Sequence, residues 1–242
     1  MSFSEELART LNYKLSQGEE MIKALIFDLD DTLYYEKEYV LGAFKEVAYY
    51  LGNKYGINEE KLYFRMKQIL ETLGRGKIFN IICEENKLNE DIKALVDIYR
   101  KSRPKLELYE DSKEFLIWAR ENGYKLGIIT DGCSKVQWNK IEALNMKSVV
   151  DKIIVTDDLG KEFWKPHKKS YFDMMCYFNI NKNECIYIGD NPNKDFIGAR
   201  ELGIKTVRII REKGDHIETF LDEDYEGDIN IKKLLEIKEI LN

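Results

Sequence analysis

Hydrophobic residues follow two spacings along the chain, and the change from one to the other divides it into regions. Residues 24–27 are uniformly apolar, which is typical of a strand buried on both faces in a parallel sheet. From residue 36 to residue 103, apolar residues recur at helical spacing, so this stretch predicts a helical insert that Pro104 ends. Residues 3–17 also have helical spacing and predict a helix packed on the core.

Predicted strands and helices alternate after Pro104. Strands are expected at residues 125–130, 152–155, 185–189 and 206–210, and helices at residues 112–122, 135–144, 170–178 and 194–202. The remainder of the chain, through residues 229–241, is expected to end in one more helix. Strands that alternate with helices form βαβ units, so the sequence predicts an α/β fold with a parallel sheet.

Composition narrows the class of protein. Hydrophobic residues make up 44% and charged residues 34% of the chain, which is ordinary for a soluble globular protein. The net charge of −6 does not favour nucleic acid as a partner, and no apolar run approaches the roughly 18 residues of a membrane helix. The four cysteines form no C-x-x-C pair and the N-terminal residues are too polar for a signal peptide, so we expect a reducing, cytoplasmic environment.

Two aspartates follow the first predicted strand. Asp28 and Asp30 are two residues apart, so in extended backbone their side chains point the same way. Neighbouring carboxylates repel each other, and a bound cation with a preference for oxygen ligands, such as Mg²⁺, removes that cost. An aspartate-rich turn after a strand is the alternative, and this motif alone does not decide between the two.

Other polar residues are expected at the same edge of the sheet. Thr130 and Asp190 also lie at or just after the carboxyl ends of predicted strands, where ligands bind in parallel α/β sheets. Thr130 and the turn that follows offer a hydroxyl and backbone N–H groups to phosphate oxygens. Lys165 precedes a predicted helix start, where anions bind well. Asp195 is also explained as a residue that caps a helix.

Together these residues resemble the haloacid dehalogenase-like hydrolase superfamily. The four family motifs occur in order, as Asp28-x-Asp30-x-Thr32, Thr130, Lys165-Pro166 and Gly189-Asp190-x-x-x-x-Asp195. The resemblance covers residues 22–33 and 106–210. It implies a Rossmann-like parallel-sheet core formed by residues 1–33 and 106–242, and a helical cap domain at residues 34–105 between the first and second motifs.

The resemblance also implies a mechanism centred on three aspartates. Asp28 would attack phosphorus and form an aspartyl-phosphate, and Asp30 would protonate the leaving oxygen and later activate water. Mg²⁺ would lie between Asp28, the backbone carbonyl of Asp30, and Asp190.

Further residues are implied around the substrate phosphate. Thr130, Asp131 and Lys165 would bind it, with Lys165 also offsetting the charge of the nucleophile. Asp195 would orient Lys165 or metal-bound waters. Asp131 departs from the family pattern, because many members have asparagine at this position.

The implied function is a magnesium-dependent phosphatase for a small phosphorylated metabolite, acting as a monomer or homodimer. A sugar phosphate, a phosphoglycolate-like acid and a nucleoside monophosphate all remain open as substrates. A phosphomutase shares the motifs and stays an alternative. A 2-haloacid dehalogenase lacks the second aspartate, so Asp30 argues against it. A non-catalytic binding module would have no need for the four charges of Asp28, Asp30, Lys165 and Asp190.

Selectivity is expected to come from the cap, because the motifs handle only the phosphoryl group. The segment Gly74-Arg75-Gly76-Lys77 interrupts the helical stripes, and the planar guanidinium of Arg75 suits a carboxylate or a second phosphate. We name Arg75, Lys77 and Tyr34 as candidate selectivity residues. A solvated turn between two helices is the alternative for this segment.

Overall fold

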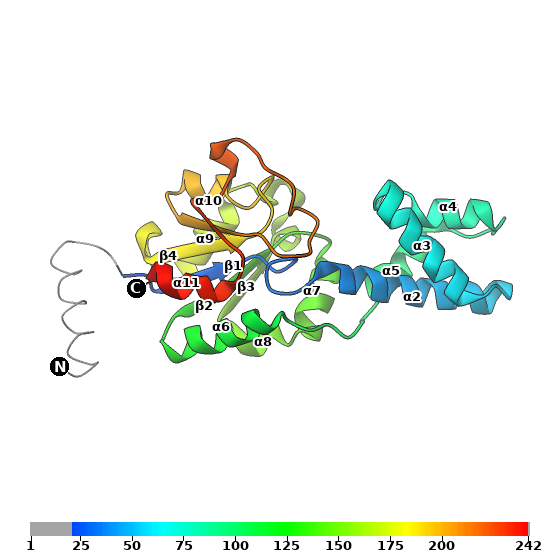
Figure 1. Cartoon of the computed structure of the whole chain (residues 1–242), viewed down its shortest axis with the longest axis horizontal. Helices are drawn as coiled ribbons and strands as arrows, with labels where there is room; N and C mark the ends of the chain where they lie inside the picture. Colours follow the sequence, from blue (N-terminus) through cyan, green and yellow to red (C-terminus); the bar gives the residue numbers. More distant parts are fainter. Residues whose placement is uncertain (1–20, 242) are drawn as a thin grey trace. The chain divides into compact units, whose positions relative to one another are not determined.

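The computed structural model describes residues 21–241 (Figure 1). The helix predicted at residues 3–17 lies outside the described residues. The described chain forms two compact units. One, here named the sheet unit, consists of residues 21–34, Leu108–Asp131 and residues 147–241; the other, the helical unit, consists of Tyr35–Glu107 and Gly132–Met146.

A six-stranded parallel sheet forms the centre of the sheet unit, which confirms the predicted α/β fold. The strand order is β3-β2-β1-β4-β5-β6, and every neighbouring pair is parallel. The strands are β1 (Ala24–Phe27), β2 (Lys125–Thr130), β3 (Lys152–Val155), β4 (Cys185–Gly189), β5 (Lys205–Ile209) and β6 (Ile229–Ile231). The central strand β1 pairs with β2 on one side and with β4 on the other, with Phe27 opposite Ile128 and Ile188.

Helices cover both faces of this sheet, as the fully buried strands β1 and β4 require. Figure 1 shows α9 (Lys169–Phe178) and α10 (Ile197–Glu201) on one side of the strands and α6 (Glu110–Glu121) on the other. Ile26 packs in the cluster that contains α9 and α10, while the next residue, Phe27, makes an edge-to-face contact with Phe115 of α6. Both side chains are fully buried, and burial of such a side chain contributes about 1.5–3 kcal/mol.

The end of the chain forms the predicted last helix, preceded by a strand that the sequence did not reveal. Residues Ile229–Ile231 form β6, and Ile237–Leu241 form the helix α11 after a 3₁₀ turn at Leu234–Glu236. The strand is held by its ladder with β5, in which Val207 lies opposite Ile229. A three-residue strand is too short to show a spacing of its own in the sequence.

The helical unit has a hydrophobic core of its own. Its helices are α2 (Glu36–Tyr55), α3 (Glu59–Leu73), α4 (Ile78–Glu85), α5 (Ile92–Lys101) and α7 (Ser134–Ala143). The helical spacing predicted for residues 36–103 is confirmed by α2, α3 and α5, whereas the eight residues of α4 were not recognised as a separate helix. The core contains Phe44, Leu51, Met66, Ile82 and Leu95.

Helix α7 belongs to the helical unit, although its residues were assigned to the core from the sequence. The reason is a set of polar contacts within the unit. Asn139 donates to the carbonyl oxygens of Arg100 and Ser102 at 3.0 and 3.1 Å, and Lys140 donates to Glu36 at 3.0 Å. The action of this unit as a cap stays a prediction. Within residues 21–241, no helix is both long enough and apolar enough to cross a lipid bilayer.

Candidate active site

Residues from separate strands meet at the carboxyl edge of the sheet. Asp28 directly follows β1, Thr130 ends β2, and Asp190 directly follows β4. Because β1 lies between β2 and β4, the sheet brings these three positions together. The backbone N–H of Asp28 continues the ladder to the carbonyl oxygen of Ile188 at 2.8 Å, which fixes the start of the loop that carries Asp30.

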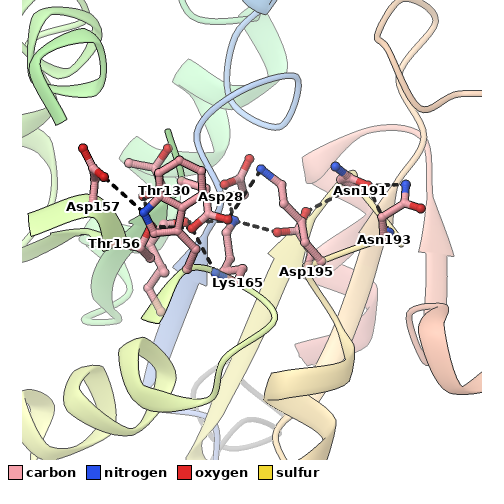
Figure 2. Close-up of polar contacts among 12 residues, drawn as sticks. Asp28, Thr130, Thr156, Asp157, Lys165, Asn191, Asn193 and Asp195 are labelled. Atoms are coloured by element: carbon pink, nitrogen blue, oxygen red, sulfur yellow. Dashed lines mark hydrogen bonds and ion pairs between the residues drawn. The ribbon is translucent and has the colours of Figure 1, made fainter. Parts of the chain in front are cut away.

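Lys165 lies at the centre of this group (Figure 2). Its side chain is fully buried, and Nζ donates to Asp28 Oδ1 and Asp195 Oδ1, both at 2.6 Å. The same ammonium contacts the hydroxyl oxygen of Tyr187 at 3.1 Å and the carbonyl oxygen of Ile129 at 3.4 Å. All the hydrogen-bonding capacity of this cation is therefore engaged by protein groups.

Asp195 is buried and bonded on both carboxylate oxygens. Oδ1 accepts from Lys165 and from the hydroxyl of Tyr187 at 3.1 Å, and Oδ2 accepts from the backbone N–H of Asn191 at 2.9 Å. Tyr171 Oη also donates to the Asp195 carbonyl oxygen at 2.8 Å. The alternative explanation of Asp195 as a helix cap does not hold, because α10 begins at Ile197 without any side-chain cap.

Asp131 holds the loop that carries Lys165. Its Oδ1 accepts from the Thr156 hydroxyl and, at 3.1 Å, from the backbone N–H of Lys165. Thr156 also lies 3.3 Å from the carbonyl oxygen of the fully buried Thr130. No motif pointed to Thr156, because its role comes from the position of the 3₁₀ turn Thr156–Leu159 after β3.

A second cation lies in the loop between β4 and α10. Lys194 Nζ is 4.0 Å from Asp131 Oδ2, and its side chain is 29% exposed. The backbone N–H groups of Lys194 and Asp195 donate to the Asn191 carbonyl oxygen at 3.2 and 3.0 Å, which fixes the loop. The sequence analysis did not single out Lys194.

Asp30 is half-buried and lies beside Tyr34. Tyr34 Oη donates to Asp30 Oδ1 at 2.7 Å, and the Tyr34 side chain is fully buried. We had named Tyr34 as a selectivity residue from the sequence. That role stays a prediction; the hydrogen bond shows that the Tyr34 hydroxyl also holds Asp30.

An acidic cluster in this site could hold a metal ion. One carboxylate oxygen from each of Asp28, Asp190 and Asp195 lies within 4.8 Å of the others. Asp28 Oδ2 is buried and has no hydrogen-bond partner among the described residues. Such an oxygen is costly to leave unpaired, and a hard cation would satisfy it. The predicted metal ligands were Asp28, Asp30 and Asp190. The sequence did not indicate that Asp195 also belongs to this cluster.

Burial and charge shift the pKa values of these groups in opposite directions. Burial raises the pKa of Asp28 to about 7, although the ammonium of Lys165 lowers it. Burial also raises the pKa of Asp190, and the charges of Asp195 and Asp28 add to the effect. Burial would raise the pKa of Asp195 as well, but Lys165 and then Lys194 lower it below its ordinary value.

Lys165 keeps its positive charge in this environment. Burial alone would lower its pKa, but the carboxylates of Asp195 and Asp28 outweigh that effect and hold the pKa well above its ordinary value. Lys165 and Asp195 therefore form an ionised pair. Burial makes the negative charges of Asp28 and Asp190 unfavourable. A cation bound between them would stabilise these charges.

The other candidate selectivity residues lie in the helical unit. Arg75 donates to Glu36 Oε2 at 2.6 Å and borders a cavity of about 300 Å³. The cavity is lined mainly by apolar side chains, including Val40, Phe44, Phe79 and Val96, and also by Arg100. Lys77 is exposed at the start of α4.

The fold and site define an α/β protein with a buried acidic centre at the carboxyl ends of a parallel sheet. Residues 25–209 match the model of a family described as haloacid dehalogenase-like hydrolase. The chain therefore belongs to the haloacid dehalogenase-like hydrolase family, which confirms the resemblance seen in its motifs.

Individual proteins are similar along nearly the whole chain. A Methanopyrus kandleri protein named glyceraldehyde 3-phosphate phosphatase is 28% identical over 91% of this chain and 97% of its own length. A Methanocaldococcus jannaschii protein with the same name is 30% identical over the same shares. A crystal structure of a HAD phosphatase from Thermococcus onnurineus superposes with a TM-score of 0.60 and 26% identity, over 91% of this chain and 98% of that one.

Proposed function

We propose that this chain is a magnesium-dependent phosphatase that hydrolyses a small phosphomonoester through a phosphorylated Asp28. The observation that carries the proposal is the state of the Asp28 carboxylate. Lys165 fixes Oδ1 at 2.6 Å, while the buried Oδ2 has no hydrogen-bond partner among the described residues and lies in the acidic cluster. The phosphatase names of the relatives support a phosphate ester as the substrate.

In the proposed first step, an oxygen of Asp28 forms a bond to phosphorus while the bond from phosphorus to the alcohol oxygen breaks. Asp30 supplies the proton that the leaving oxygen takes up. In the second step, water attacks the phosphorus of the aspartyl-phosphate and Asp30 accepts a proton from it. Inorganic phosphate leaves and the Asp28 carboxylate is restored.

Other residues of the site prepare Asp28 and Asp30 for these steps. Lys165 orients the Asp28 carboxylate and is itself held by Asp195 and Tyr187. Tyr34 donates to Asp30 and limits the directions that its carboxyl group can take. Thr130 would donate its hydroxyl to a phosphoryl oxygen, and Asp131 supports the adjoining loop through Thr156 and Lys165.

The acidic cluster fits Mg²⁺ by the chemistry of its donors. Asp28 and Asp190 would hold the ion together with the Asp30 backbone carbonyl, and Asp195 lies close enough to bind a metal-bound water or the ion itself. When bound, the ion would neutralise charge on the carboxylates and the phosphoryl group. Burial makes the charged form of Asp28 unfavourable and so raises its pKa, and a bound cation would offset this cost.

A panel of substrates tests this proposal. The purified protein would be incubated with Mg²⁺ and glyceraldehyde 3-phosphate, phosphoglycolate, phosphoserine, sugar phosphates, nucleoside monophosphates or 4-nitrophenyl phosphate, and released phosphate would be measured. We expect release that EDTA abolishes, and glyceraldehyde 3-phosphate is the first compound to test. Chloride release from 2-chloropropionate without metal would replace the proposal by a dehalogenase. Phosphoryl transfer within a sugar, without free phosphate, would replace it by a phosphomutase.

We also propose that Arg75 and Lys77 contribute to the choice of substrate. Arg75 combines a cation with an adjoining apolar cavity, which is a common composition for a site that selects among small organic anions. Its ion pair with Glu36 holds the guanidinium in place, and a fixed donor loses less freedom when it binds.

A further inference from the structure

The two lysines of the sheet unit's site differ in how their ammonium groups are used. Lys165 contacts four protein oxygens within 3.4 Å. Lys194 has no hydrogen-bond acceptor for its ammonium within residues 21–241, and its nearest opposite charge is Asp131 Oδ2 at 4.0 Å. An ammonium group carries three donors, so those of Lys194 remain available to a ligand.

The position of Lys194 is fixed although its ammonium is not hydrogen-bonded. Its backbone N–H donates to the Asn191 carbonyl oxygen, and the next residue is the fully buried Asp195. The side chain is 29% exposed, so part of it can be reached from solvent. This combination suits a group that binds an incoming ligand, because the backbone that carries it is ordered in advance.

The charge balance of the site indicates which ligand this would be. Carboxylates outnumber ammonium groups, since Lys165 and Lys194 lie among Asp28, Asp30, Asp131, Asp190 and Asp195. With all of these side chains ionised, the net charge of the site is still negative after a divalent cation has bound. A phosphomonoester is itself a dianion, and the donors of Lys165 are already engaged by protein oxygens. A further cation with free donors would therefore strengthen binding of the dianion.

We propose that Lys194 is a second cationic ligand of the substrate phosphoryl group, and that it stays near Asp131 when no phosphate is bound. The inference rests on the proposed phosphatase function. The ligand class is a phosphomonoester dianion or inorganic phosphate, whose non-bridging oxygens accept from the ammonium. Lys165 then acts mainly to orient Asp28, and Lys194 supplies the charge that attracts and holds the phosphate.

A purely structural role would make Lys194 the counter-ion of Asp131. The geometry argues against it, because 4.0 Å is beyond hydrogen-bond range and a partly exposed pair of this kind contributes about 0–1 kcal/mol. Asp131 Oδ1 is already held by Thr156 and by the backbone of Lys165. An Asp131→Asn variant keeps an oxygen for these two donors, so it removes the counter-ion role without removing the loop contacts.

The first experiment measures binding of inorganic phosphate by calorimetry in the presence of Mg²⁺, with kcat and KM on the best substrate measured in parallel. Loss of a charge-assisted hydrogen bond predicts that Lys194→Gln weakens phosphate binding and raises KM by about tenfold or more. Lys194→Arg should recover most of the affinity. Lys205→Gln is the matched control, because Lys205 is exposed at the amino end of β5, away from the carboxyl edge. Equal phosphate affinity in wild type and Lys194→Gln would overturn the inference.

The second experiment repeats Lys194→Gln in the Asp131→Asn background. If Lys194 binds phosphate, the substitution still costs about tenfold in affinity; if Lys194 only neutralises Asp131, it costs nothing there and the inference fails. Phosphate binding also separates this inference from the proposed function. Lysine-dependent binding without turnover of any phosphomonoester would reject the phosphatase and keep Lys194, whereas turnover unaffected by Lys194→Gln would reject only the role of Lys194.

Discussion

Each of the two units contains a buried ionic cluster, and the two clusters are balanced in opposite ways. In the helical unit, one carboxylate, Glu36, lies between two cations. Its oxygens accept from Lys140 at 3.0 Å and from Arg75 at 2.6 Å. In the sheet unit, Lys165 lies between two carboxylates, Asp28 and Asp195, at 2.6 Å each.

The helical cluster is complete in itself. Burial would raise the pKa of Glu36, but Lys140 and Arg75 outweigh it and hold the pKa well below its ordinary range. Lys140 also lies 5.3 Å from the centre of the Tyr39 ring, and its side chain is only 3% exposed. These contacts join the start of α2 to α7 and to the loop before α4, so we assign Glu36 and Lys140 a structural role.

The sheet cluster is not complete. Burial raises the pKa of Asp28 to about 7 and raises that of Asp190, and Asp28 Oδ2 has no hydrogen-bond partner within the described part of the chain. Under the proposed function, charge balance rather than burial therefore separates the structural ionic cluster from the one that would receive a cation and an anionic substrate. Single substitutions in each cluster test this distinction.

Replacement of the nucleophile should have the largest effect. Asp28→Asn keeps an oxygen for Lys165 but removes the charge that attacks phosphorus. Loss of a covalent nucleophile typically lowers kcat by about 10⁴-fold or more, and we expect a loss of that order in phosphate release from the best substrate. Asp173→Asn is the matched control, since Asp173 pairs with Lys169 on the surface of α9 and should not affect turnover. Turnover of Asp28→Asn within tenfold of wild type would exclude the covalent mechanism.

Removal of a metal ligand should have the next largest effect. Asp190→Ala should raise the Mg²⁺ concentration for half-maximal activity by about 10–100-fold or more, because an oxygen of the acidic cluster is lost. A readout without turnover is the melting temperature, which Mg²⁺ should raise in wild type and raise much less in this variant. An equal rise in both proteins would mean that the ion binds elsewhere.

Much of the sheet unit could be predicted from the sequence because its signals are local. The apolar runs that became β1, β2 and β4 each end in a polar residue, and parallel strands bring such ends together. Asp28, Thr130 and Asp190 were singled out for that reason, and the structure places Asp28 and Asp190 in one acidic cluster.

Contacts between distant residues could not be predicted in the same way. Tyr187 lies within a uniformly apolar strand, and its role depends on Asp195 lying beside its hydroxyl. The contact of Thr156 with Asp131 depends on the turn after β3. The ion pair between α7 and α2 joins Lys140 to Glu36, which are 104 residues apart in the sequence. Two side chains that pair across such a distance in the sequence produce no periodic pattern of residues from which the contact could be predicted.

Disruption of the helical cluster should affect stability instead of chemistry. Lys140→Met removes one cation from Glu36, whose side chain is 18% exposed. We expect a loss of about 3 kcal/mol in the free energy of unfolding, at the low end for a broken buried pair, because Glu36 is partly exposed and Arg75 remains. Denaturant unfolding measures the loss. Adding Glu36→Gln to this variant should restore part of the stability, because the uncompensated charge is removed. If Lys140→Met is as stable as wild type, the cluster does not have the structural role assigned to it.

The smallest expected effect concerns Arg75, where the helical cluster borders the cavity. Arg75→Ala should raise KM severalfold for the best natural substrate and leave hydrolysis of 4-nitrophenyl phosphate nearly unchanged, because a contact with the remote part of a substrate contributes only when that part is present. The Arg75 side chain is 45% exposed, against 3% for Lys140, and Lys140 still pairs with Glu36 in this variant, so little stability should be lost.

The helical unit offers a closely matched control for Arg75. Arg65 forms an ion pair with Glu85 at 2.5 Å, and its side chain is 42% exposed against 45% for Arg75, but Arg65 does not line the cavity. Arg65→Ala should therefore leave both KM values unchanged. A KM rise in both arginine variants would point to a general effect of lost surface charge, and no rise in either would assign Arg75 to the structural cluster with Glu36. A rise confined to Arg75 would show that one residue of a balanced ionic cluster can also select the substrate.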